Sequence, residues 1–302
     1  MRLHPRHILC STDLSDTSYP AIVYGIALAR EFEARLTICH VVDLPSPSMY
    51  GEAYIEPKEY LDRSETYARK RIDEIMEGQN VRWGTTITVG NPADEIAKIA
   101  REEHIDVALA ATRGHSGLKR VLIGSVTERL IHILPCPLLV VRRGQEPIGL
   151  PLDGEFRFQR ILVGCDFSPD SVLANRHALS LAQEFQAELH LVHVIEPPTY
   201  LDLMKTGEAL EMTLRDDIRQ MLMDNLDNLI PEDARLWCTS EIALLEGRPE
   251  NELIRYGEEH DVDLIVMGVR GRGLIGSLFI GSTTDRIVRR ASCPVLAVCS
   301  KE

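Results

Sequence analysis

Residues 247–271 read GRPENELIRYGEEHDVDLIVMGVRG, and residues 90–114 read GNPADEIAKIAREEHIDVALAATRG. Each stretch has a proline as its third residue, and the missing N–H of a proline costs little at the start of a helix. The apolar run that follows, IDVALAA at 105–111 in the first copy, predicts a buried strand. Both copies end in a glycine, so one helix, one strand and one glycine loop are expected twice.

The repeat extends outward from these stretches over nearly the whole chain. The pairs are HILCSTDLSD (7–16) with RILVGCDFSP (160–169), ARLTICHVVD (34–43) with AELHLVHVIE (187–196), and IGSVTERLIHILPCPLLVV (123–141) with IGSTTDRIVRRASCPVLAV (280–298). The first two pairs are offset by 153 residues and the last by 157. A net four residues are therefore inserted between the second strand and Gly247, as a surface loop tolerates.

The chain of 302 residues suits two domains. The segment RRGQEPIGLPLDGEFRF (142–158) holds three glycines and two prolines and lacks apolar periodicity. We predict a first domain over residues 1–143, a linker over 144–157 and a second domain over 158–302.

Each half is expected to be an α/β domain. In the first half, strands are predicted at 7–12, 35–42, 85–89, 105–111 and 138–141, alternating with helices at 17–33, at 58–77, from Pro92 and at 125–134. This alternation predicts a five-stranded parallel sheet with helices on both faces. Right-handed crossovers favour a flavodoxin-like strand order 3-2-1-4-5. Ligands of such sheets bind beyond the carboxyl ends of the first and fourth strands.

Composition limits the classes of partner. The net charge of −13 repels nucleic acid and anionic membrane surfaces. Seven cysteines without a C-x-x-C pair argue against a disulfide framework or a zinc site, and they suit a reducing cytosol. No apolar run approaches the length of a membrane span, and no signal peptide is recognisable. His190 and His193 lie three apart on a predicted strand and face opposite sides, which argues against a joint metal site.

The loop after the fourth strand of the second half has the composition of an anion site. Gly268 and Gly271 are followed by Gly281 and Ser282, and then by a helix. The glycines allow close approach of the backbone to a ligand. Ser282 is expected to cap the helix, whose free N–H groups and positive dipole end favour a phosphate, with Thr283 and Thr284 as further donors. The alternative is a loop that only turns the chain.

These residues match the pattern G-x2-G-x9-G-[ST], and together with the flanks GSTTDRIV, CPVLAV and ILCSTDLSD the chain strongly resembles the universal stress protein family over nearly all of both halves. The resemblance implies an ATP-binding, stress-response regulatory protein. Its implied contacts include Asp13 and Val41, repeated as Asp166 and Val194. From the residues alone, either Asp could instead cap the first helix.

The resemblance assigns the same set of positions to each half. In the second half they are Gly164, Cys165, Asp166, Val194, Met267, Gly268, Gly271, Gly281, Ser282, Thr283 and Thr284. In the first half they are Ser11, Thr12, Asp13, Val41, Ala110, Ala111, Gly114, Gly124, Ser125, Val126 and Thr127. Ala111 replaces the first glycine of the pattern, so we hypothesise that the second half binds ATP and the first binds more weakly or not at all.

ATP is the expected ligand, with Mg²⁺ beside it, although ADP or AMP would satisfy the same adenosine contacts. The last strands are expected to pair the two halves with each other. A homodimer of two chains is a further expectation, as is a protein partner of unknown identity. Residues 44–57 and 196–209 are the expected lids. Two alternatives stay open: a slow ATPase or autophosphorylating protein that uses Ser125 or Ser282, without a dedicated base or arginine finger, and a ligand-free interaction module.

Overall fold

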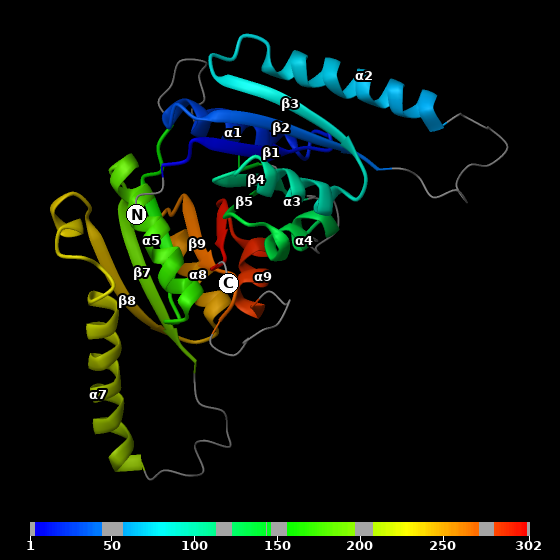
Figure 1. Cartoon of the computed structure of the whole chain (residues 1–302). Coiled ribbons are helices and arrows are strands. Elements are labelled where there is room, and N and C mark those ends of the chain that lie inside the picture. The colour runs from blue at the N-terminus through cyan, green and yellow to red at the C-terminus, as the bar shows by residue number, and fades with distance from the viewer. Residues whose placement is uncertain are drawn as a thin grey trace. The chain divides into compact units, whose positions relative to one another are not determined.

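The computed structural model describes residues 4–43, 57–112, 123–142, 144–145, 156–196, 208–271 and 281–300. The chain divides into two compact units, one over His4–Phe156 and the other from Arg157 onward (Figure 1). The predicted site residue Gly114 and nearly all of the two predicted lids lie outside the described residues.

The first unit alternates strands with helices along the described chain. Its elements are β1 (His7–Ser11), α1 (Tyr19–Glu31), β2 (Arg35–Val42), α2 (Pro57–Met76), β3 (Arg82–Val89), α3 (Pro92–Glu102), β4 (Val107–Ala111), α4 (Ser125–Ile133) and β5 (Leu138–Val141). The helix predicted from Pro92 begins there, and Asn91 caps it by accepting a hydrogen bond from the N–H of Asp94.

The second unit repeats this order. Its elements are β6 (Arg160–Gly164), α5 (Pro169–Phe185), β7 (Glu188–Ile195), α7 (Glu208–Asp227), the 3-10 turn η2 (Ala234–Leu236), β8 (Ser240–Glu246), α8 (Pro249–Glu259), β9 (Leu264–Gly268), α9 (Ser282–Arg290) and β10 (Val295–Val298). The connection from α7 to β8 covers residues 228–239 and contains η2, whereas that from α2 to β3 covers only 77–81. The connection in the second unit is therefore the longer one, and shorter segments elsewhere between β7 and β8 reduce the difference to the net four residues inferred from the repeat offsets.

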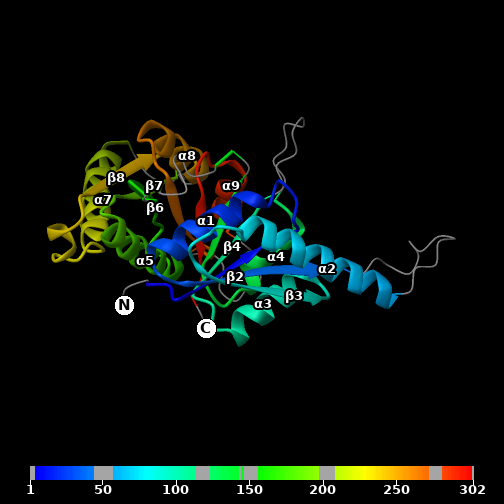
Figure 2. The same ribbon diagram turned by 90° about the horizontal axis from the view of Figure 1, so that it is seen from above.

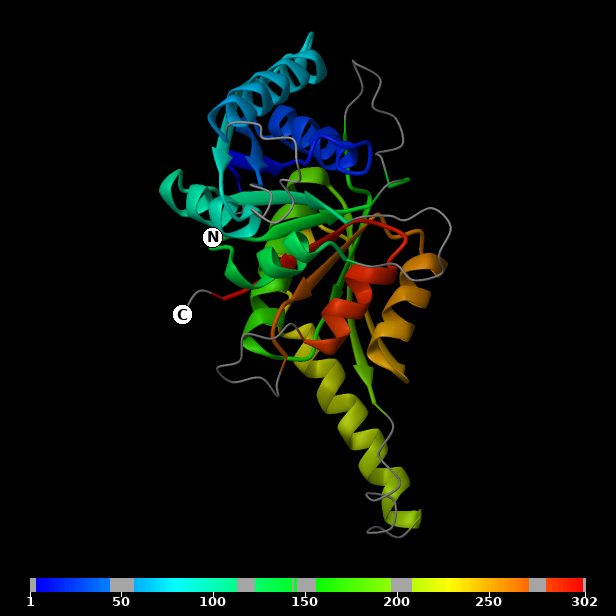
Figure 3. The ribbon, with the colours of Figure 1, turned by 90° about the vertical axis from the view of Figure 1, so that its right-hand side faces the viewer.

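Each unit has a parallel sheet in the predicted order. The strands run β3-β2-β1-β4-β5 in the first unit and β8-β7-β6-β9-β10 in the second, so the order 3-2-1-4-5 is confirmed in both. Right-handed crossovers then put helices on both faces of each sheet. Figure 2 shows α2 along β2 and β3, and Figure 3 shows α8 beside α9. The predicted α/β fold is therefore correct.

The central strands form the core of each unit. Ile8, Leu9 and Cys10 of β1 and Ile161, Leu162 and Val163 of β6 have no exposed surface. Such continuous apolar runs are typical of parallel strands buried on both faces.

His177 of α5 makes the second unit sensitive to acid. Its Nδ1 is buried without a hydrogen-bond partner among the described residues, and burial lowers the pKa of the ring to about 4. Because the folded pKa lies below the ordinary 6.5, the stability contributed by the neutral ring is present above pH 6.5 and is lost as the pH falls toward 4. We expect His177→Phe to weaken this acid dependence, measured as urea midpoints between pH 7 and 4. An unchanged dependence would contradict this.

Candidate functional site

A cavity of about 350 Å³ opens at the carboxyl ends of β1 and β4 in the first unit. This end of a parallel sheet is where ligands of doubly wound folds bind, and the volume falls in the range of small-molecule sites. Ten of the residues singled out from the sequence line it, namely Ser11, Thr12, Asp13, Val41, Ala110, Ala111, Gly124, Ser125, Val126 and Thr127. The fold therefore gathers residues from four separate stretches of sequence around one space.

Seven further lining residues were missed at the sequence level. They are Thr17, Ser18, Cys39, Asp43, Pro92, Ile96 and Thr112. Asp43 and Thr112 directly follow β2 and β4, so the rule that ligands lie at the carboxyl ends of strands could have found them. Pro92 and Ile96 come from α3, and no sequence signal distinguishes them from other helix residues.

The turn after β1 holds Asp13 at the cavity. The Asp13 carboxylate accepts hydrogen bonds from the N–H and the hydroxyl of Ser15, and the Thr12 hydroxyl accepts from the N–H of Leu14. Leu14 has φ +63°, and the corresponding Phe167 has φ +60°. Left-handed backbone is unfavourable for such side chains and is often found near functional sites. Asp13 thus shapes the turn two residues ahead instead of capping α1, whose N-cap is Ser18.

A histidine braces this turn in each unit. His40 Nδ1 lies 2.9 Å from the carbonyl oxygen of Thr12, and His193 Nδ1 lies 2.7 Å from that of Cys165. A carbonyl only accepts, so Nδ1 carries the proton in both rings. His193 is therefore a positioning residue for the turn between β6 and α5.

The amino end of α4 forms the wall opposite the turn. Ser125 is the first helical residue and Gly124 is the N-cap, without a side-chain cap. Gly281 and Ser282 are arranged in the same way at α9. The expectation that Ser282 caps the helix is thus wrong by one residue, because the glycine already adopts the extended backbone of a cap. The uncapped N–H groups of the first turn are left for another acceptor.

Two threonines of these helices bond the preceding strand. Thr127 donates its hydroxyl to the Ala111 carbonyl at 3.0 Å, and Thr284 donates to the Gly268 carbonyl at 2.7 Å. The expectation that Thr284 offers its hydroxyl to a ligand is therefore wrong, since a strand carbonyl already accepts that proton. Both bonds instead fix the helix start to the end of the central strand.

The second unit brings its motif glycines together. The N–H of Gly281 donates to the Val269 carbonyl at 2.8 Å. A Cβ built on Gly281 would lie 3.7 Å from the Gly271 nitrogen, and one on Gly271 would lie 2.9 Å from the Asp166 carboxylate. Gly164, Cys165 and Val194 occupy the ends of β6 and β7, as predicted, and Met267 packs against Gly164. Residues 272–280 of the loop lie outside the described range.

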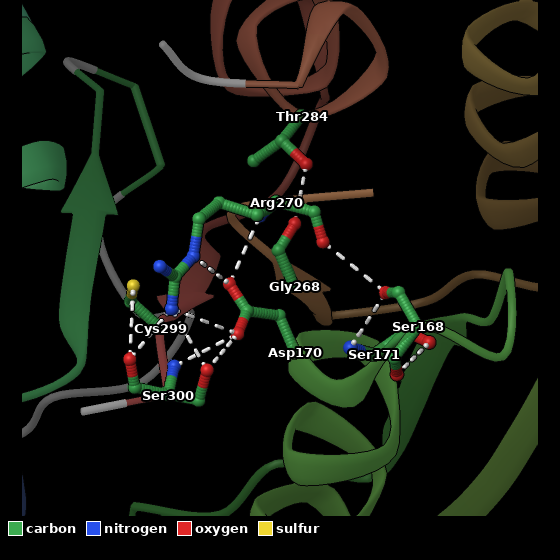
Figure 4. A network of polar contacts seen from close by, with 8 residues as sticks. All are labelled: Ser168, Asp170, Ser171, Gly268, Arg270, Thr284, Cys299 and Ser300. Atoms are coloured by element: carbon green, nitrogen blue, oxygen red, sulfur yellow. Dashed lines mark hydrogen bonds and ion pairs between the residues drawn. The ribbon is translucent and has the colours of Figure 1, made fainter. Parts of the chain in front are cut away.

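A buried carboxylate organises the start of this loop (Figure 4). Asp170, 3% exposed, accepts hydrogen bonds from the backbone N–H and the guanidinium of Arg270 and from the N–H and hydroxyl of Ser300. Burial alone would raise the pKa of Asp170, but the hydrogen bonds from Ser300 and Arg270 outweigh it and hold the pKa below 3.8. Ser168 caps α5 and also donates its hydroxyl to the Arg270 carbonyl. No sequence signal pointed to this network.

The two units differ at the position of the first motif glycine. A Cβ on Gly268 would lie 2.6 Å from the Ser171 nitrogen and 2.7 Å from the Asp170 carbonyl carbon. In the repeat, Pro169, which begins α5, corresponds to residue 16, whereas α1 begins only at Tyr19. The later start of α1 leaves room for the methyl group of Ala111, which lines an open cavity. Gly268 is therefore required because the first turn of α5 leaves no room for a Cβ at this position.

Two other features of the first unit are less suited to chemistry. Cys39 lines the cavity, but burial, with smaller effects from Glu103 and Glu95, raises the pKa of its thiol to about 12, so it is not a ready nucleophile. A wider hollow of about 820 Å³ is lined only by side chains of α2, from Asp62 onward, and by Glu77, which directly follows the helix. Charged residues of a single helix around an open hollow indicate a solvated helix face.

Comparison with known proteins gives one family for both units. The universal stress protein family matches residues 4–142 and again 157–298. A universal stress protein of Mycolicibacterium smegmatis is 26% identical over 308 aligned residues and 96% of each chain, and one of Thermus aquaticus is 38% identical over 47% of this chain and 98% of its own. The crystal structure of a universal stress protein from Archaeoglobus fulgidus has the same fold, with a TM-score of 0.72, 22% identity and coverage of 98% of this chain and 99% of its own.

None of the described helices is both long enough and apolar enough to cross a membrane. The repeated sequence, the doubly wound sheet in each unit and the two family matches agree with one another. The chain belongs to the universal stress protein family and carries one family domain in each half.

Proposed function

We propose that this protein binds an adenine nucleotide as a regulatory ligand, with ATP as the form bound. The observation that carries the proposal is the cavity of the first unit, where ten sequence-assigned residues surround one space. Its mixed wall suits a nucleoside. Val41, Ile96 and Ala110 offer apolar surface to a base, and the Asp13 carboxylate can accept hydrogen bonds from ribose hydroxyls.

The phosphates would lie at the amino end of α4. Gly124, Ser125 and Val126 line the cavity there, and the helix end carries a positive partial charge. The described lining residues include two carboxylates, Asp13 and Asp43, and no lysine, arginine or histidine. Phosphates near two carboxylates need a compensating cation, so Mg²⁺ would accompany ATP, with Asp43 as an oxygen ligand.

Both units are candidates, for different reasons. The second has the complete glycine pattern, and Gly271, Gly281 and Asp166 lie close together. The first has Ala111, but the methyl group stands at the wall of a cavity that remains open. We therefore revise the expectation of a weak first half and propose one nucleotide in each unit.

Regulation fits the described cavity better than turnover. Phosphoryl transfer relies on cations and a positioned base around the γ-phosphate. Among the described lining residues the side chains able to accept a proton are Asp13 and Asp43, and the Cys39 thiol is held neutral. Measurable ATP hydrolysis would mean that residues beyond the described lining supply the missing catalytic groups.

The test compares matched variants of the two units. Nucleotide released on denaturing fresh protein is counted per chain, and ATP with Mg²⁺ is then titrated into stripped protein. Asp13→Asn and Asp166→Asn keep the oxygen that accepts from the turn N–H but remove the charge. Each is expected to weaken one site by about 1.5–3 kcal/mol, at least tenfold in Kd.

Asp16→Asn is the control, because Asp16 is exposed in the same turn and does not line the cavity. Loss of all binding through Asp166→Asn alone would restore the asymmetric hypothesis. Absence of binding at millimolar ATP would favour the ligand-free interaction module. Pairing of the halves through their last strands, a homodimer and a cytosolic location stay predictions.

A further inference from the structure

Three chemically active side chains meet at the amino ends of two strands in the second unit, away from the glycine loop. Glu188 begins β7, and His190 follows two residues later on the same face. His190 is the register partner of Glu241 on β8. One ligand atom from each of the three side chains lies within 4.8 Å of the others.

His190 has a nitrogen that the described residues do not satisfy. The side chain is 2% exposed, and Nε2 is buried without a hydrogen-bond partner among them. The nearest carboxylate oxygen, Oε2 of Glu188, lies 3.8 Å away, too far for a hydrogen bond. A buried polar atom of this kind needs an explanation, and an ion between the two groups is one.

The other ring nitrogen of His190, Nδ1, has a hydrogen-bond partner on α8. His190 Nδ1 lies 3.0 Å from the hydroxyl of Tyr256 on α8. The Glu241 carboxylate lies on the same side of the ring, with Oε2 3.6 Å from Nδ1, too far for a hydrogen bond. In the tautomer with the proton on Nδ1, the Tyr256 hydroxyl accepts this hydrogen bond from Nδ1–H. This tautomer leaves the lone pair on Nε2, the arrangement common in metal-binding histidines.

We infer that Glu188, His190 and Glu241 bind a divalent transition-metal ion, with His190 acting through Nε2. One imidazole and two carboxylates suit Zn²⁺, at about 2.0–2.2 Å from each ligand atom. The side chains of Glu188 and Glu241 are 36% and 51% exposed, so they can rotate inward and leave positions for water. Arg160, whose Nε lies 3.7 Å from the Glu188 carboxylate, competes with the ion for that ligand.

The first unit lacks the equivalent site. The repeat aligns Glu188, His190 and Glu241 with Arg35, Thr37 and Gly84. There the imidazole near this end of the sheet, His7, is satisfied, because its Nε2 lies 2.8 Å from the Thr37 hydroxyl and its Nδ1 lies 3.0 Å from the Glu103 carbonyl oxygen. The inference is thus specific to the second unit and does not depend on nucleotide binding.

The experiment uses the full chain, stripped with chelator and titrated with ZnCl2 by calorimetry, and with Co²⁺ by visible absorption. One ion per chain is expected at this site, with Co²⁺ bands of nitrogen and oxygen ligation. Glu188→Gln and Glu241→Gln, at partly exposed positions, should each weaken binding at least tenfold. Tyr256→Phe tests the positioning residue and should cost about 10-fold or more.

Glu103→Gln is the matched control, since Glu103 lies beside His7 at the corresponding end of the first sheet, and it should leave affinity unchanged. His190→Gln should abolish the site, with far-ultraviolet circular dichroism confirming that the variant folds. Retention of wild-type affinity in both glutamate variants would overturn the inference. So would a Co²⁺ spectrum dominated by thiolate charge transfer, or no binding at 100-fold excess over chain.

Discussion

Replacing Gly268 with alanine is expected to lower the free energy of unfolding of the second unit by about 2–3 kcal/mol. The new Cβ would lie 2.6 Å from the Ser171 nitrogen and 2.7 Å from the Asp170 carbonyl carbon. Both are backbone atoms of the first turn of α5, so no side-chain rotation relieves the overlap. Either the helix start or the end of β9 must shift, and both belong to the proposed nucleotide site.

Ala111→Gly is the matched control, because it makes the opposite change at the corresponding position of the first unit. It removes one methyl group from a cavity wall and should cost about 0.5–1 kcal/mol. Urea unfolding of Gly268→Ala is followed by Trp237 fluorescence in a Trp83→Phe background, and that of Ala111→Gly by Trp83 fluorescence in a Trp237→Phe background, so that each variant is measured in its own unit. Equal destabilisation by the two changes would show that the helix start yields easily, and would refute the steric argument.

Asp170→Ala is expected to cost about 3–5 kcal/mol, the usual loss when one partner of a buried ion pair is removed. It removes the carboxylate that pairs with the Arg270 guanidinium, 21% exposed, and accepts from the N–H of Ser300, while the guanidinium keeps its hydrogen bond to the Ser300 carbonyl oxygen. Because the folded pKa of Asp170 lies below its ordinary value, its stabilisation is present above about pH 4 and is lost as the pH falls through the folded pKa. The wild type and the variant should therefore converge in acid.

Thr17→Ala is the control for this change, since Thr17 occupies the corresponding position in the first unit and lines the cavity. Its loss should alter stability by less than about 1 kcal/mol. Urea unfolding at pH 7, 5 and 3 measures both variants. A gap between wild type and Asp170→Ala that stays constant across this range would mean that the carboxylate does not act through its charge.

The fold could be predicted because its signals are local and repeated. Buried runs such as HILCS in β1, a proline at the start of α3 and a glycine after β4 each constrain a few residues, and the second copy supplies the same pattern independently. Strand order followed from the handedness of crossovers. The residues at the carboxyl ends of β1 and β4 were found for the same reason, since topology alone brings them together.

The polar networks could not be predicted, because their partners are far apart in sequence. Asp170 meets Arg270 across 100 residues and Ser300 across 130, with no spacing rule to link them. The hydroxyl of Thr284 looks like a free donor in sequence, yet it bonds the Gly268 carbonyl. The cluster at His190 depends on the register between β7 and β8. The hydrophobic pattern alone does not fix this register, because neither strand alternates strictly between apolar and polar residues.

The Asp170 network also bears on how the second unit is made. A ribosome adds about 5–20 residues per second, so Ser300 follows Asp170 by roughly 7 to 26 seconds. During nearly all of that interval β10 is incomplete, and the carboxylate must remain hydrated at the surface of a growing chain. Closure of α5 onto its sheet is then a late step of synthesis, and the nascent domain depends on residues translated last to bury a charge translated early.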